Sequence, residues 1–223
     1  MKEVRIADEQ ADDPEKVQVG HLTEHSETER LESAAEQISK MEQLRPDVWS
    51  RLTETQKEWS LRRVGEKLSR VYECPAPPFI ASSLPPGRAG GYSDWNYLTR
   101  LDHQEIRSND VHEALDSYCH EFRHAYQNEQ AGRYDSGYLH RQEFHLRSYR
   151  SETEGRFNSP FRHLCHDEAK AAQWAENLRP GNYVSSDVDP ERYRGQPVEK
   201  DAWDFAGRIT DAVRRRQQGH TGM

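Results

Sequence analysis

Residues 111–132 read VHEALDSYCHEFRHAYQNEQAG, and their pattern predicts one long helix that ends near Gly132. Apolar residues recur along it at spacings of three and four, the period of a helix face: Leu115, Tyr118, Phe122 and Ala125. His120 and His124 lie four residues apart in this segment. Such positions differ by about 40° around the helix axis and about 6 Å along it, so both imidazoles reach the same region from one face.

These two histidines suit a zinc ion, because imidazole nitrogen is a preferred zinc ligand. Glu121 is rotated by about 100° from His120 and can approach a zinc-bound water without becoming a ligand. Zinc lowers the pKa of such a water toward about 7, and a carboxylate takes its proton as the oxygen attacks a peptide carbonyl. We therefore expect His120 and His124 to be two ligands and Glu121 to be the catalytic base. Two surface histidines on an ordinary helix are the alternative.

A zinc site of this kind needs a third protein ligand. The pattern HExxHxxGxxH is excluded, because Gln127 and Gln130 stand where Gly and His are required. A final helix, expected from Pro197 to about Gln218, begins with Glu199 in line with a core-facing series: Ala202, Ala206, Ile209 and Val213. A carboxylate in such a position is costly to bury unless it is paired, which favours Glu199 as the third ligand.

An alternative role for Glu199, with another residue as the third ligand, is also considered. Glu199 near a helix start also suits a residue that merely complements the helix dipole. In that case His140 or His145 would supply the third ligand.

The segment HEFRHAYQ at 120–127, together with ExxAxxFA at 199–206, resembles gluzincin zinc metallopeptidases. The small ImmA/IrrE-like peptidases and the metallopeptidase domains of bacterial polymorphic toxins are the most similar groups. The resemblance covers about residues 48–210, with specific signatures in these two helices only. It implies that Glu199 is the third ligand, that the reaction is peptide-bond hydrolysis and that substrate pairs as an added strand along a sheet edge above the zinc.

One position departs from the gluzincin pattern. Trp203 stands where many gluzincins carry Asp or Asn in contact with a ligand histidine. Asp116, one turn before His120, is the expected substitute, with a solvated aspartate as the alternative. Tyr183 and Tyr193 are candidates to donate a hydrogen bond to the oxyanion, although either could simply pack.

The rest of the chain predicts an α+β, zincin-like fold with N-terminal helices, a small twisted sheet, the HExxH helix and a C-terminal ligand helix. Capping boxes at Ser26 and Thr53 begin the N-terminal helices. Residues 75–108 are rich in Pro, Gly and β-formers and predict the sheet, with one or two strands over 97–108. A further helix is expected over Asp167–Leu178 within a loop-rich, tyrosine-rich stretch.

We expect a disordered acidic tail over residues 1–25, an accessory helix over 26–45 and the zinc metallopeptidase domain over 46–218. The tail lacks a secretory signal and no segment reaches the roughly 20 apolar residues of a membrane helix. The mean hydropathy of −1.12 agrees with an unpacked tail. Three cysteines without a CxxC motif indicate a reducing compartment, so a cytoplasmic protein, or one delivered by a signal-independent secretion system, is expected.

The net charge of −8, with 31% charged residues of mixed sign, disfavours binding to nucleic acid or to anionic membrane. The expected function is a zinc-dependent endopeptidase with one zinc per chain, acting on a specific protein or peptide substrate, with an immunity or regulatory partner. The alternative is a non-catalytic module of the same fold that binds proteins. Cys74 could act as a thiolate in the open zinc position.

Overall fold

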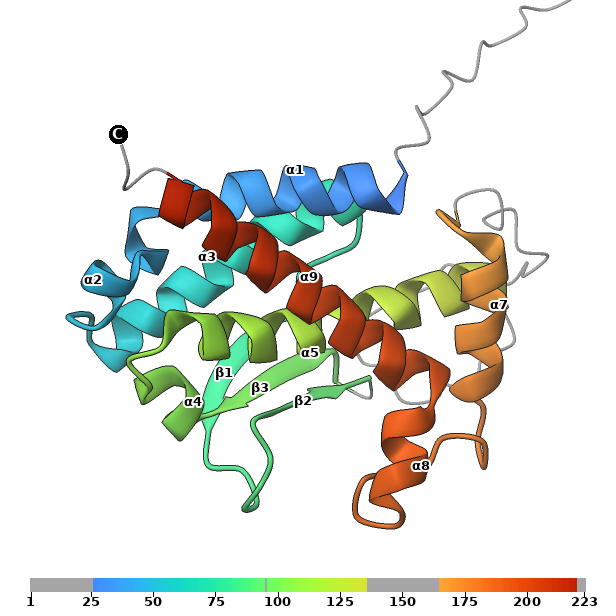
Figure 1. The fold of residues 1–223 in the computed structure, drawn as a ribbon. Coiled ribbons are helices and arrows are strands. Elements are labelled where there is room, and N and C mark those ends of the chain that lie inside the picture. Colours follow the sequence, from blue (N-terminus) through green and yellow to red (C-terminus); the bar gives the residue numbers. More distant parts are fainter. Residues whose placement is uncertain (1–25, 95, 136–164, 220–223) are drawn as a thin grey trace, which may run out of the picture.

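The structure, a computed structural model, describes residues 26–94, 96–135 and 165–219. Helices dominate these residues and a small sheet lies among them, so the expected α+β class is confirmed (Figure 1). The helices are α1 (Glu27–Ser39), the 3-10 helix η1 (Glu42–Leu44), α2 (Pro46–Trp49), α3 (Glu54–Tyr72), α4 (His103–Arg107), α5 (Val111–Tyr134), α7 (Glu168–Asn177), α8 (Pro190–Gly195) and α9 (Pro197–Gly219). The strands are β1 (Phe79–Ser82), β2 (Gly90–Ser93) and β3 (Leu98–Asp102). The tail expected at 1–25, and His140 and His145, lie outside the described residues.

Each of the longer helices begins at a side-chain cap or at a proline. Ser26 and Thr53 each accept from the backbone N–H three residues on, and both expected capping boxes are complete. Asp110 caps α5 by accepting from the backbone N–H of His112 at 2.8 Å. Asp167 caps α7, and Pro197 begins α9, where its fixed φ suits the first turn. None of the described helices is long and apolar enough to cross a membrane.

The sheet has the strand order β1-β3-β2, with β1 parallel and β2 antiparallel to β3. Strand β2 is therefore an edge strand of this sheet.

The segment 97–108 holds the single strand β3 followed by helix α4. The change comes at Asp102, whose Oδ1 accepts from Gln104 N at 2.8 Å and caps the new helix. The same carboxylate accepts from Leu84 N at 2.8 Å, which ties the β1–β2 connection to β3.

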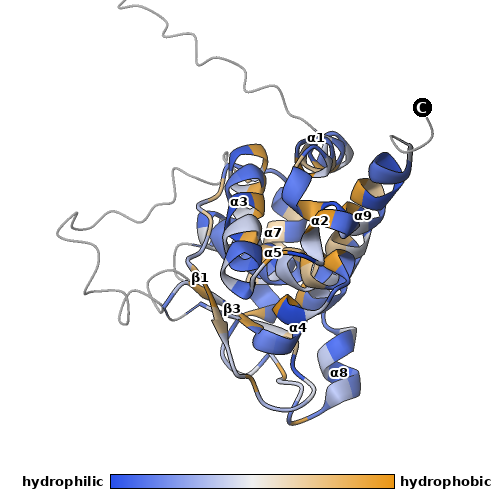
Figure 2. Ribbon diagram, turned by 90° about the vertical axis from the view of Figure 1, so that its left-hand side faces the viewer, coloured by the Kyte–Doolittle hydropathy of each residue, from blue (hydrophilic) through white to orange (hydrophobic). Residues whose placement is uncertain are grey.

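Helix α5 occupies the centre of the described structure, with α9 crossing it and α7, β2 and β3 packed against it (Figure 1). Because neighbours cover several of its faces, α5 buries polar as well as apolar residues. The buried polar side chains on α5 are His120, Glu121, Arg123, Gln127, Asn128 and Gln130. Each of the longer helices carries both hydrophobic and hydrophilic stretches, as one buried and one exposed face require (Figure 2).

Helix α1 is part of the same core and not a peripheral addition. Its buried residues, Leu31, Ala34, Ala35 and Ile38, belong to one cluster with the buried residues of α5 and α9. Helix α1 packs mainly on α9. Residues 26–45 and 46–218 thus both contribute to one hydrophobic core.

Candidate metal centre

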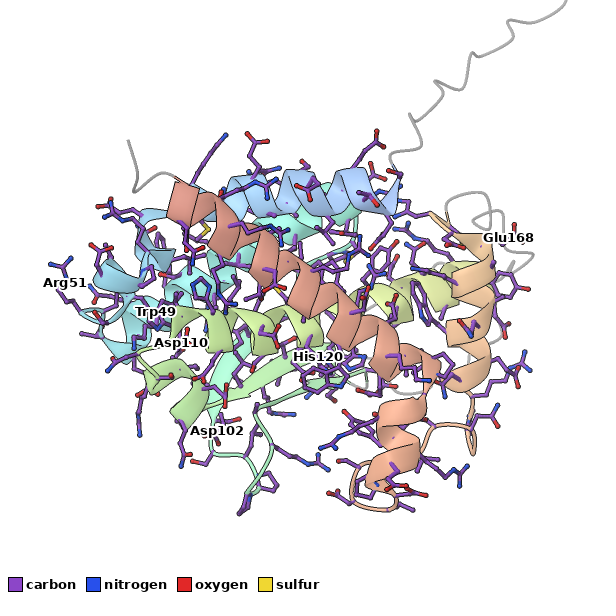
Figure 3. The ribbon with its side chains drawn as sticks, in the orientation of Figure 1. Trp49, Arg51, Asp102, Asp110, His120 and Glu168 are labelled. Atoms are coloured by element: carbon purple, nitrogen blue, oxygen red, sulfur yellow. The ribbon has the colours of Figure 1, made fainter. Side chains whose placement is uncertain are left out.

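Three side chains from two helices converge below the crossing of α5 and α9. His120 and His124 extend from α5 and Glu199 from the first turn of α9, and one ligand atom of each lies within 4.8 Å of the others. Nε2 of His120 is 3.0 Å from Nε2 of His124 and 3.4 Å from Oε2 of Glu199. Nε2 of His124 is 3.5 Å from Oε1 of Glu199. Figure 3 shows His120 on α5 beside α9. This buried group could hold a metal ion.

The geometry and the chemistry of the three side chains both fit a cation. Donors about 2.0–2.1 Å from a tetrahedral ion are about 3.3 Å from one another, and the three separations are close to that value. Glu199 is 0% exposed, and its Oε2 has no hydrogen-bond partner among the described residues. A buried carboxylate is costly unless positive charge compensates it, and a bound cation would supply that charge.

The charges of the group couple metal binding to protonation. Burial raises the pKa of the Glu199 carboxyl, but His120 and His124 outweigh burial and hold that pKa far below its usual range. Burial lowers the pKa of His124, yet Glu199 and then Glu121 raise it to about 9. The pKa of His120 is lowered, chiefly by burial. Glu199 is therefore an anion at neutral pH, and a metal binding at His124 displaces a proton.

Glu121 lies beside this group and against the edge strand β2. Glu121 is 7% exposed, and the backbone N–H of Tyr92 lies close enough to its carboxyl to oppose the rise in its pKa. Burial raises the pKa of its carboxyl to about 7, and the charge of His124 opposes the shift. A Cβ at Gly90 would lie 2.8 Å from Oε1 of Glu121, so only glycine permits β2 to approach this closely.

Both candidate tyrosines reach the group through Glu199. Oη of Tyr183 donates to Oε1 of Glu199 at 2.9 Å, and the hydroxyl of Tyr193 lies close enough to this carboxylate for its charge to raise the pKa of the phenol. Tyr193 is presented by α8, a helix that forms inside the tyrosine-rich linker because Asp189 caps two of its N–H groups. Burial, and then the charge of Glu199, raise the pKa of both phenols, so the hydroxyls keep their protons at neutral pH.

Asp116 does not make the contact expected of it. Nδ1 of His120 is buried without a hydrogen-bond partner in the described part of the chain. Burial raises the pKa of Asp116, and its next strongest interaction is with Thr210 of α9. Trp203 instead covers the imidazole of His120, with ring centroids 4.2 Å apart and planes tilted by 48°.

Three polar residues near the centre were missed in the sequence. Gln127 contacts the ring of His124, Asp201 contacts Gln127, and Arg123 pairs with Asp201. A signal was present, because Arg123, Gln127 and Gln130 follow one line of α5 at spacings of four and three. On a helix predicted to be largely buried, such a line of polar side chains requires partners.

Cys74 does not belong to the metal-binding group. It is 2% exposed in the hydrophobic core, and burial raises the pKa of its thiol to about 12. The suggestion that Cys74 occupies a metal position as a thiolate is therefore wrong.

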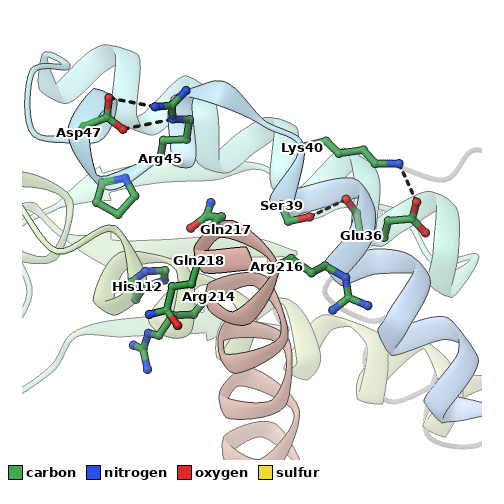
Figure 4. A pocket seen from close by; sticks show the side chains of 11 residues that line it. Glu36, Ser39, Lys40, Arg45, Asp47, His112, Arg214, Arg216, Gln217 and Gln218 are labelled. Atoms are coloured by element: carbon green, nitrogen blue, oxygen red, sulfur yellow. Dashed lines mark hydrogen bonds and ion pairs between the residues drawn. The ribbon is translucent and has the colours of Figure 1, made fainter. Parts of the chain in front are cut away.

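A groove of about 820 Å³ opens elsewhere on the surface, between the ends of α1 and α9 and the start of α2 (Figure 4). None of its lining residues belongs to the metal centre. Its cations are partly neutralised within the groove, since Lys40 pairs with Glu36 at 2.6 Å and Arg45 pairs with Asp47 at 3.2 Å. It carries no arrangement of catalytic groups comparable to that around Glu199.

No family model, curated protein or solved structure matches this chain. Functional inference therefore depends on the residues and geometry of the site itself.

Proposed function

We propose that the chain is a zinc-dependent endopeptidase. The observation that carries this proposal is the convergence of His120, His124 and Glu199 within 4.8 Å, directly beside the buried carboxyl of Glu121. Two imidazoles and one carboxylate are a donor set of catalytic zinc, whereas calcium and magnesium favour oxygen donors alone. The resemblance of both helices to gluzincins supports the same assignment.

The chemistry follows from the side chains around the centre. Zinc bound there would lower the pKa of water and polarise a carbonyl oxygen. Glu121 would accept the proton of the attacking water and return it to the leaving amine. Tyr183, after turning from the Glu199 carboxylate that it now bonds, and Tyr193, whose hydroxyl lies near the same carboxylate, would donate to the oxyanion.

The edge of β2 that faces away from β3 pairs with no other strand in the described part of the chain, and this edge suits an extended peptide. Asp102 N donates to Ala89 O across the β2–β3 ladder. Hydrogen-bonded and non-hydrogen-bonded pairs alternate in an antiparallel ladder, so Gly90 and Tyr92 turn their backbone polar groups away from β3. The backbone N–H of Tyr92 lies near Glu121 at that edge. A substrate paired with this edge would thus run past the catalytic base.

Zinc content tests the ligand set. The wild-type protein should contain about one zinc per chain, and Glu199→Ala should lose most of it because only two protein ligands remain. Asp204→Ala is the matched control, since Asp204 lies on the same helix, is exposed and pairs with Arg208. Asp201 is unsuitable as a control because it binds both Arg123 and Gln127. Equal zinc in the Glu199 and Asp204 variants would exclude Glu199 as a ligand.

The variant Glu121→Gln tests catalysis separately from binding. It should retain zinc but cleave peptides about 10²–10⁴-fold more slowly, because the general base is removed. Cleavage of a diverse peptide library, followed by mass spectrometry, would measure both proteins. Cleavage by the variant at the wild-type rate would exclude Glu121 as the base. A wild-type protein that binds zinc and cleaves nothing in the library would favour a non-catalytic binding module.

A further inference from the structure

Both donor positions of the Gln127 amide and its oxygen have partners at or beside the metal centre. Gln127 is 0% exposed. Its Oε1 lies 2.9 Å from Nδ1 of His124. Its Nε2 donates to the backbone oxygen of Val198 at 2.8 Å and to Oδ2 of Asp201 at 2.9 Å. One side chain of α5 therefore contacts a metal-binding histidine and the first turn of α9 at once.

The partners of Nε2 determine which way this amide faces. A backbone oxygen and an ionised carboxylate can only accept hydrogen bonds, so the NH₂ group must point to Val198 and Asp201. Oε1 then faces His124, and because an amide oxygen only accepts, Nδ1 of His124 must carry a hydrogen. In the neutral imidazole this leaves the lone pair on Nε2, the atom that faces His120 and Glu199.

The same contacts of Gln127 also position Glu199, the third residue of the metal-binding group. Val198 and Asp201 lie on either side of Glu199 in the chain, so the two bonds from Gln127 hold the turn that presents this carboxylate. Arg123 keeps Asp201 in position, with Nε 2.7 Å from Oδ2 and Nη2 3.2 Å from Oδ1. Arg123 is 1% exposed and lies over the rings of Tyr126 and Phe205, so it has little freedom to move.

We propose that Gln127 is a positioning residue that holds His124 in the Nδ1–H tautomer and holds the Glu199 turn of α9 against α5. This inference rests on the zinc centre of the proposed function. Gln127 touches neither substrate nor metal, and it acts through His124 and Glu199. A partner of this kind changes metal affinity by about 10–100-fold when it is removed.

The variant Gln127→Met tests the proposal, because methionine is similar in length and lacks the amide. Gln130→Met is the matched control: Gln130 is also on α5 and 0% exposed, but its Oε1 accepts from His166 N, away from the centre. Zinc affinity, measured by competition with a chelator, should fall about 10–100-fold in Gln127→Met and less than about threefold in Gln130→Met. Both variants lose a buried amide, so an effect of general destabilisation would appear in both.

A magnetic resonance signal separates positioning from a merely structural role. In the zinc-loaded wild type and in Gln130→Met, the Nδ1–H of His124 should give a slowly exchanging ring proton, because Gln127 accepts from it. This signal should be lost in Gln127→Met. The variant Gln127→Glu keeps an acceptor for His124 and removes the donors to α9, so it should retain the signal while binding zinc more weakly. It also serves if Gln127→Met does not fold.

The outcomes distinguish this inference from the proposed function. Wild-type protein that binds no zinc would overturn the zinc centre. Wild-type protein that binds zinc tightly, with Gln127→Met equal to Gln130→Met in affinity and in the ring-proton signal, would overturn the role of Gln127 and leave the zinc centre intact.

Discussion

The two histidines of the metal centre differ in what surrounds the side of each ring that faces away from Glu199. Nδ1 of His124 faces Gln127, which is joined through Asp201 to the buried Arg123. Nδ1 of His120 has no hydrogen-bond partner among the residues that the structure describes, and its ring lies against Trp203. Trp203 is 48% exposed, whereas Gln127 is 0% exposed. One histidine is therefore held by a buried polar network and the other by a half-exposed aromatic contact.

This difference indicates that the centre is organised from the His124 side. A buried polar network is strongly destabilised when one member is removed, because the remaining groups lose their partners in a medium of low dielectric constant. An aromatic contact at the surface loses only its contact area and the preference of the two rings for each other. Substitutions in the network around His124 should therefore lower stability or zinc affinity more than a substitution of the aromatic contact beside His120.

The largest effect is expected for Arg123→Met. Arg123 pairs with Asp201 at 2.7 Å, and its Nη1 lies 2.9 Å from Oε1 of Glu27 at the start of α1. Removing the cation leaves the largely buried Asp201 carboxylate with only Gln127 and the more distant Lys170 as partners, and losing the main partner of a buried charge costs up to about 3–5 kcal/mol. Denaturant unfolding of the zinc-free protein should show this loss. Arg208→Met is the control, because Arg208 forms an exposed pair with Asp204 and should change the unfolding free energy by less than about 1 kcal/mol. Similar losses in both variants would contradict a buried network on the His124 side.

The features predicted from sequence share a local origin. The capping boxes at Ser26 and Thr53 and the helix carrying His120 and His124 depend on residues within a few positions of one another. Glu199 could be singled out because its line along the final helix is otherwise apolar, and the structure brings it to the two histidines. The α+β class followed from the change in composition over residues 75–108.

The features that sequence did not predict depend on which elements meet in space. The line of polar residues on α5 indicated that Gln127 needs partners, but the identity of these partners, Val198 and Asp201, depends on α9 crossing α5. The expectation for Asp116 failed because its helix face meets Thr210 and not the free nitrogen of His120. Of the one or two strands expected over 97–108, the structure has one, β3, and Asp102 caps helix α4 directly after it.

An intermediate effect is expected for Gly90→Ala, which tests how β2 places Glu121 on the His124 side. The new Cβ would lie 2.8 Å from Oε1 of Glu121 and 2.8 Å from Cδ2 of Leu101, so either β2 or Glu121 must move. Overpacking of this kind costs about 1–3 kcal/mol, and cleavage should fall while zinc is retained. Gly91→Ala is the neighbouring control, since its Cβ would meet no atom within 4 Å. Because Gly91→Ala removes a glycine from a strand, it should leave the free energy of unfolding unchanged or raise it by up to about 1 kcal/mol. Equal cleavage by the two variants would show that β2 does not position Glu121.

The smallest effect is expected for Trp203→Ala, which tests the His120 side directly. The substitution removes a ring 4.2 Å from the centroid of His120 and leaves every contact of Gln127 in place. An aromatic pair contributes about 0.5–1.5 kcal/mol, so zinc affinity should fall by no more than about tenfold. Trp59→Ala is the control for losing an exposed tryptophan, because Trp59 is 56% exposed on α3 and lies over Arg63. It should leave zinc affinity unchanged. If Trp203→Ala weakened zinc binding more than Gln127→Met does, the aromatic contact would be the stronger of the two supports, and the centre would be organised from His120.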